Sequence, residues 1–173
     1  MKNITLTTLI AFLCVLSLTS QAQDSNMVKK YYHNEPLPTE IKIPSDTGMT
    51  EFRSKFIGTH KITLQWLQNL DRDNAGKMTV AVDSTGKLLV DGYQEEMNNR
   101  QKNFMRLKGE IFLIDEKTLL FNGKIEIRVD YTDKGNTSVR EGYYIFKKMG
   151  KRKYFRMQNG RDVFDQVEYI DIY

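Results

Sequence analysis

The sequence predicts an all-β fold, an antiparallel meander of about eight strands that closes into a barrel and follows one short helix. Three observations support this. Apolar and polar residues alternate along most of the chain after residue 57, as in strands with one wet face. Short turn-forming segments separate these runs, and glycines stand inside several of them. Composition is that of a globular chain, with 40% hydrophobic and 28% charged residues, which excludes disordered, collagen-like, disulfide-scaffold and polytopic membrane classes.

The alternation is clearest in residues 118–131. There Phe121 and Ile125 share one face, and Lys124 and Glu126 share the other. The same reading along the chain places strands at 58–67, 77–82, 87–93, 104–115, 118–131, 138–147, 152–159 and 166–173.

Turn chemistry fixes how these strands are connected. Hairpin turns are expected at 83–86 and 132–136, and Gly150 and Gly160 mark two more. Because such short connections join neighbouring antiparallel strands, the expected topology is a meander.

Glycines inside the strands favour a closed barrel. They are Gly58, Gly92, Gly109, Gly123 and Gly142. Glycine weakens a strand unless a bend or a close approach requires it, so these positions suit a coiled sheet that closes on itself. A two-sheet sandwich is the alternative, in which the chain would change sheets at 94–103. An eight-stranded barrel either holds one small ligand or fills with side chains.

Residues 1–22 have the pattern of a cleaved signal peptide. Lys2 precedes an apolar stretch at 9–18, and small residues end the segment, which predicts export to the periplasm, the cell surface or the medium. An uncleaved anchor is the alternative. No membrane span is expected in the exported chain, and Cys14 would leave with the signal.

Residues 23–45 are expected to form an extended arm, and residues 46–173 the barrel domain. The arm carries all the prolines, Pro36, Pro38 and Pro44, together with the Tyr31-Tyr32 pair. Loose packing or disorder is the expected state of the arm.

A short helix is expected near the start of the barrel domain. Met49, Phe52 and Phe56 have helical spacing, and Asp46 or Thr47 is the expected cap.

The entry into the first strand resembles that of lipocalins, in which a helix closes the barrel floor before a Gly-x-Trp. Here residues 56–60 read Phe-Ile-Gly-Thr-His, so His60 takes the tryptophan position and Trp66 follows later. The resemblance implies a late-strand arginine over that position, either Arg140 or Arg156. The segments 58–66, 140–143, 153–158 and 169–173 resemble exported lipocalin-like (calycin-type) proteins of unknown function from Bacteroidetes, a resemblance that implies fold and export but no activity.

No familiar enzyme motif is present. The two histidines, His33 and His60, are far apart, so neither a zinc site nor another metal site is expected. The segment 71–76 resembles the start of a calcium loop but lacks later oxygen ligands, and it is interpreted as a polar turn. Without a nucleophile or an acid–base pair to name, no catalytic residue is assigned, and the sequence predicts no enzymatic activity and no cofactor.

The densest basic run lies around Gly150. It consists of Lys147, Lys148, Lys151, Arg152, Lys153 and Arg156. In an exported protein such a run would meet an anionic glycan or a lipid headgroup rather than nucleic acid. Its expected state is local neutralisation by the acids that follow, Asp162, Asp165, Glu168 and Asp171.

Two strand faces combine charged and apolar side chains. His60, Ile62, Leu64 and Trp66 share one face of the first strand, and Arg140, Tyr144 and Phe146 share a face of the sixth. If both turn inward, the barrel mouth would suit a small amphipathic ligand whose carboxylate an arginine grips. With Arg156, these residues are the candidate ligand-binding set.

Two functions remain open from the sequence. The first is non-catalytic binding of a small, partly apolar ligand in the barrel mouth. The alternative is a protein- or glycan-interaction module that uses the outer surface and the arm, with a homodimer as a further possible assembly. A filled barrel, with His60 bonded to the backbone and Arg140 capping one end, is the competing structure for the interior.

Overall fold

A computed structural model describes residues 30–45, 50–67, 75–98, 101–158, 160–162 and 165–173. The fold is all-β, as predicted, and contains a closed antiparallel barrel of eight strands. The barrel strands are β2 (Gly58–Leu64), β3 (Gly76–Val82), β4 (Leu88–Asn98), β5 (Gln101–Asp115), β6 (Thr118–Arg128), β7 (Thr137–Lys147), β8 (Phe155–Met157) and β9 (Ile170–Ile172).

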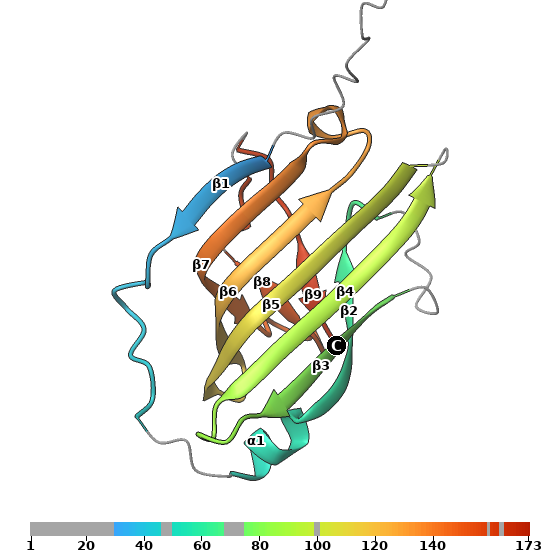
Figure 1. The fold of residues 1–173 in the computed structure, drawn as a ribbon. Helices are drawn as coiled ribbons and strands as arrows, with labels where there is room; N and C mark the ends of the chain where they lie inside the picture. Colours follow the sequence, from blue (N-terminus) through green and yellow to red (C-terminus); the bar gives the residue numbers. More distant parts are fainter. Residues whose placement is uncertain (1–29, 46–49, 68–74, 99–100, 159, 163–164) are drawn as a thin grey trace, which may run out of the picture.

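The predicted meander is confirmed. Strands β2 to β7 are sequential neighbours, β9 pairs with β2, and the β7–β8 pairing closes the ring (Figure 1). The sandwich alternative is therefore excluded. The proposed sheet change at 94–103 is wrong, because Asn98 and Gln101 are the last paired residues of a long β4–β5 hairpin.

The arm contributes a strand that the sequence did not predict. Residues Lys30–Glu35 form β1, which pairs in parallel with β7 from Thr137 to Gly142. Farther along β7, the same edge pairs with β8 at Phe146 and Lys147. Strand β1 thus lies beside the barrel wall on an edge that β8 covers only in part (Figure 1).

A short helix, α1 (Glu51–Phe56), lies at one end of the barrel, as predicted (Figure 1). Its cap is Thr50, whose hydroxyl oxygen accepts a hydrogen bond from the Arg53 amide at 3.2 Å, so the expected caps Asp46 and Thr47 are wrong. Phe56 is buried and packs edge-on against Phe155 at 5.9 Å. The helix therefore anchors its C-terminal turn in the core.

Three of the predicted glycines form a row across the wall. Gly109 of β5 is paired with Gly123 of β6, which is paired with Gly142 of β7. A Cβ on Gly123 would lie 2.4 Å from the Lys108 carbonyl oxygen and 2.7 Å from the Gly109 Cα. Gly142 has a φ of +129°, a conformation that L side chains rarely adopt. The row permits a backbone approach that other residues would block.

The interior is a continuous apolar cluster. Every barrel strand contributes to it, and Phe121, Tyr144 and Phe146 are among its largest fully buried side chains. No described helix has the length and apolar character needed to cross a membrane.

Candidate functional site

The two predicted inner faces do turn into the barrel. Ile62 and Leu64 of β2 are fully buried, as are Tyr144 and Phe146 of β7. Trp66, just beyond β2, packs against the same core while partly exposed. On β2 the alternation alone predicted the inward face. On β7 the opposite face, with Val139, Tyr143 and Ile145, is equally apolar in the sequence, and the burial of Tyr144 and Phe146 decides between the two faces.

His60 and Arg140 do not form a joint site. His60 stands at the α1 end of β2, where its ring nitrogens lie 2.8 Å from the Phe56 carbonyl oxygen and 3.1 Å from the Tyr173 backbone oxygen. Arg140 lies near the opposite end, which we call the mouth. The histidine bonded to backbone oxygens matches the filled-barrel alternative.

Arg140 has a carboxylate partner from its own chain. The guanidinium pairs with Glu168, both side chains being about 1% exposed, and it donates to the Arg161 carbonyl oxygen at 3.0 Å. Its guanidinium carbon lies 5.8 Å from the centre of the Tyr144 ring. The carboxylate of Glu168 thus binds Arg140 where a ligand's carboxylate was predicted to bind.

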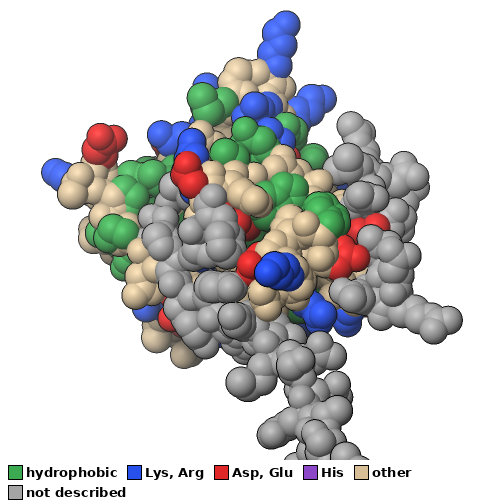
Figure 2. Space-filling model, turned by 90° about the horizontal axis from the view of Figure 1, so that it is seen from above, with side chains coloured by type: hydrophobic (Ala, Val, Ile, Leu, Met, Phe, Trp, Pro, Cys, Tyr) green, Lys and Arg blue, Asp and Glu red, His purple; other side chains and the backbone are tan. Residues whose placement is uncertain are grey.

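Ligand binding in the mouth stays a prediction. Seen from above, the mouth end shows hydrophobic side chains in patches between projecting Lys and Arg side chains (Figure 2). Of the polar turn predicted at 71–76, residues 71–74 lie outside the described residues, as do 163–164.

Arg156 is separate from the interior residues. It lies between Phe155 and Met157, which face the core, and it pairs on the outer side with Asp171 at 2.6 and 2.7 Å. Hydrogen bonding to this carboxylate raises the pKa of Arg156. Its guanidinium carbon lies 4.4 Å from the centre of the Tyr169 ring.

The expected neutralisation of the basic run holds for Arg156 alone among the described residues. Glu168 pairs with Arg140, and Asp165 pairs with Arg161. The carboxylate of Asp162 accepts from the Gln166 amide at 2.8 Å. The acids that follow the run are thus engaged elsewhere, because the register places only Asp171 opposite one of its members.

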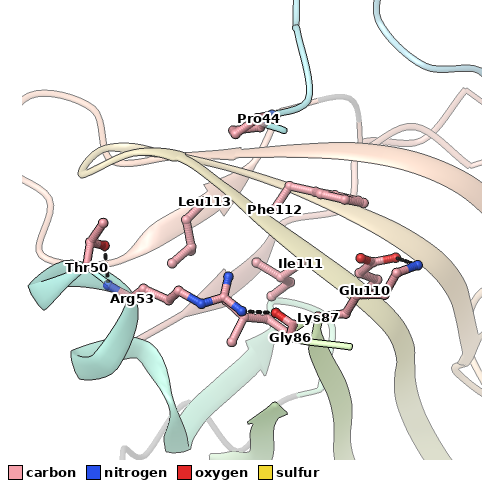
Figure 3. A pocket seen from close by; sticks show the side chains of 10 residues that line it. Pro44, Thr50, Arg53, Gly86, Lys87, Glu110, Ile111, Phe112 and Leu113 are labelled. Atoms are coloured by element: carbon pink, nitrogen blue, oxygen red, sulfur yellow. Dashed lines mark hydrogen bonds and ion pairs between the residues drawn. The ribbon is translucent and has the colours of Figure 1, made fainter. Parts of the chain in front are cut away.

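A third arginine, Arg53, lies in a cavity that the sequence pattern did not predict. This cavity, the Arg53 pocket, measures about 220 Å³ and lies between α1, the β3–β4 turn and the end of β5. Arg53 extends from the helix toward Gly86, with Leu113 and Ile111 beside it (Figure 3). Leu88 completes an apolar lining, and Pro44 of the arm also borders the space.

The pocket's arginine is held at both ends. Its guanidinium Nη2 donates to the Gly86 carbonyl oxygen, and its own amide is tied to Thr50. The turn that presents Gly86 is closed by Asp83, whose carboxylate accepts from the amides of Thr85 at 2.8 Å and Lys87 at 2.9 Å. These hydrogen bonds, that of Lys87 foremost, lower the pKa of Asp83.

Among the described residues that line the Arg53 pocket, two are cationic and one is acidic. The ammonium group of Lys87 lies 3.4 Å from Glu110, the only acidic residue that lines the cavity in the described structure. No described carboxylate pairs with Arg53. No local sequence pattern marks Arg53 as a site residue. The residue that positions its guanidinium is Gly86, in a turn that is distant in sequence.

Comparison with known proteins identifies relatives without assigning a function. The model of the PM1083 family matches residues 40–173. The chain is 33% identical over 166 residues to an uncharacterised protein of Pasteurella multocida (strain Pm70). This alignment covers 95% of the present chain and 91% of the relative. No solved structure matches the chain. The resemblance to lipocalin-like proteins of Bacteroidetes stays an expectation. The chain belongs to the PM1083 family.

Proposed function

We propose that the protein is a non-enzymatic binding protein for a small carboxylate with a short apolar chain, held in the Arg53 pocket. The observation that carries this proposal is the guanidinium of Arg53, fixed beside an apolar lining with no carboxylate partner among the described residues. The ligand class is the one expected from the sequence, but the arginine is a different one.

The chemistry of the pocket favours a carboxylate. A guanidinium offers a planar set of N–H donors that matches two carboxylate oxygens, and its charge strengthens those hydrogen bonds. Leu88, Ile111 and Leu113 would remove the ligand's alkyl chain from water. A cavity of about 220 Å³ limits the ligand to a small molecule.

The polar groups of the pocket favour binding over catalysis. Thr50 is occupied as the helix cap, and Glu110 is held by Lys87. A nucleophile with an adjacent base is the usual minimum for acyl or glycosyl transfer. The described lining residues supply no such pair.

Isothermal titration with butanoate, hexanoate and octanoate tests the proposal. Hexan-1-ol serves as the uncharged probe. We expect hexanoate to bind and hexan-1-ol to bind at least tenfold more weakly, since a hydrogen bond to a charged group contributes about 1.5–3 kcal/mol. Arg53→Gln should lose about tenfold or more in affinity, and Arg53→Lys should recover only part of it. Arg106→Gln, on the outer face of β5, is the matched control.

Two outcomes contradict the proposal. One is equal binding by the native protein and Arg53→Gln, while thermal unfolding shows both folded. The other is a change in the fluorescence of Trp66, the only tryptophan, on adding hexanoate. Because Trp66 lies toward the mouth, that signal would favour the mouth site predicted from the sequence.

We also propose that the protein acts after export. The support is the signal-like pattern of residues 1–22. Mass spectrometry of the protein from its own host should find an N-terminus near Gln23, and an intact residue 1 would contradict export by cleavage.

A further inference from the structure

A second recess lies on the outer wall of the barrel, away from the Arg53 pocket. It has a volume of about 650 Å³ and combines basic and aromatic side chains. We call it the basic groove. The residues that define it are Lys61, Lys151, Arg152, Lys153, Tyr154 and Tyr173.

Elements distant in sequence build the basic groove. Lys61 projects from the outer face of β2, opposite the buried Ile62. Tyr173 follows β9, and its amide donates to the Lys61 carbonyl oxygen at 2.9 Å. The segment between β7 and β8 supplies the other side through Arg152 and Tyr154.

The aromatic residues of the groove form one platform. The rings of Tyr154 and Tyr173 have centroids 5.0 Å apart at an interplanar angle of 42°. Arg152 lies 6.0 Å from the centre of the Tyr154 ring. Tyr173 is 48% exposed, so the platform is open to a ligand.

Three cations of the groove take part in no ion pair within the described part of the chain. No ion pair between described residues includes Lys151, Arg152 or Lys153. The closest charged neighbour along β8, Arg156, is already neutralised by Asp171. Like charges gathered in a recess raise the local positive potential and attract anions.

We propose that the basic groove binds a chain of acidic sugars, such as a uronate or sulfated polysaccharide. The side chains of Lys151, Arg152 and Lys153 would meet the repeated acid groups, and the tyrosine platform would contact the apolar faces of sugar rings. A recess accommodates a polymer chain better than it accommodates a flat membrane surface. Among polyanionic chains, the expected export favours a polysaccharide over a nucleic acid.

Binding of oligosaccharides measured by titration tests this inference. The probes are a decamer of galacturonate, a dextran sulfate of similar length, and neutral dextran. The triple variant Lys151→Gln/Arg152→Gln/Lys153→Gln should bind the acidic probes about tenfold more weakly, because it removes three charge–charge contacts that are each modest at an exposed site. Tyr173→Ala should weaken binding at every salt concentration, because its contact is apolar.

A matched variant removes the same charge elsewhere. Lys108→Gln/Lys117→Gln/Lys134→Gln changes three exposed lysines outside the groove and should bind as the native protein does. Equal weakening by both triple variants would overturn the proposal in favour of attraction by net charge. Tighter binding of an oligothymidylate, or of vesicles containing an anionic phospholipid, would overturn the assignment to a polysaccharide.

Polysaccharide binding in the basic groove is independent of carboxylate binding in the Arg53 pocket. Arg53→Gln should leave the affinity for galacturonate unchanged, and the groove variants should leave the affinity for hexanoate unchanged. Loss of both affinities in either variant would contradict the separation of the two sites.

Discussion

Arg140 and Glu168 place a full positive and a full negative charge inside the protein, each about 1% exposed. Taking either charge out of water is costly, and only the partner offsets that cost. The pair also fixes structure, because Arg140 belongs to β7 while Glu168 lies in the segment between β8 and β9. This ion pair therefore joins the C-terminal segment to the barrel wall.

Removing one member of the pair should destabilise the protein strongly. We expect Arg140→Met to lower the free energy of unfolding by about 3–5 kcal/mol, because Glu168 would remain buried without a counter-ion. Arg140→Met/Glu168→Leu should recover much of that loss. Urea unfolding followed by circular dichroism measures both. Arg161→Met is the control, since its pair with Asp165 is largely exposed and should contribute at most about 1 kcal/mol. Equal costs for Arg140→Met and Arg161→Met would refute this account.

At the scale of the strands, the curvature of the barrel wall depends on glycines. The row of Gly109, Gly123 and Gly142 crosses β5, β6 and β7 where these backbones approach closely. Gly92 of β4 differs, because a Cβ there would meet the Met78 side chain at 3.2 Å rather than a backbone atom. A flexible methionine can move, whereas a paired strand cannot.

Replacement by alanine should lower the free energy of unfolding by different amounts at the two kinds of glycine. Gly123→Ala forces contacts of 2.4 Å with the Lys108 carbonyl oxygen and 2.6 Å with the Phe121 ring. We expect a loss of about 3 kcal/mol or more, at the upper end of the range for overpacking. Gly92→Ala should cost less than about 1 kcal/mol, because Met78 can adjust. Guanidinium unfolding of the two variants provides the comparison, and a larger loss for Gly92→Ala would contradict it.

The elements differ in how well the sequence predicted them, for physical reasons. The barrel strands and the inner face of β2 were predictable, because burial of one face imposes a period of two. The inner face of β7 was not, since both of its faces are apolar. Strand β1 was not, since it joins β7 through backbone pairing, which any side chain permits. The same limit applies to the sites: Arg140 was correctly placed inside, but neither Glu168 beside it nor Gly86 beside Arg53 follows from local pattern.

On the scale of the whole molecule, β7 is where closure and the arm meet. Its second edge pairs with β1 over Thr137–Gly142 and with β8 at Phe146 and Lys147. Without β1, the first of these stretches would leave backbone N–H and C=O groups unpaired at a sheet edge, a known template for association. The arm therefore protects an edge that the barrel strands leave open.

A disulfide tests whether β1 pairs with its own barrel. Asn34 and Glu141 are exposed residues in direct register across β1 and β7. The chain's only cysteine, Cys14, lies in the expected signal, so Asn34→Cys/Glu141→Cys in a chain beginning at residue 23 would carry one defined pair. Because Cα atoms in register lie within the range that a disulfide spans, we expect an intrachain bond that stabilises the protein by about 2–4 kcal/mol.

The control moves one cysteine out of register. Asn34→Cys/Tyr143→Cys places the second thiol two residues along β7 from Glu141 and should oxidise slowly, since the Cα atoms are then too far apart for an unstrained disulfide. Non-reducing electrophoresis and intact-mass measurement distinguish the products. A covalent dimer of the in-register variant would show that β1 pairs with the barrel of a second copy, and equal oxidation of the two variants would show that β1 has no fixed register on β7.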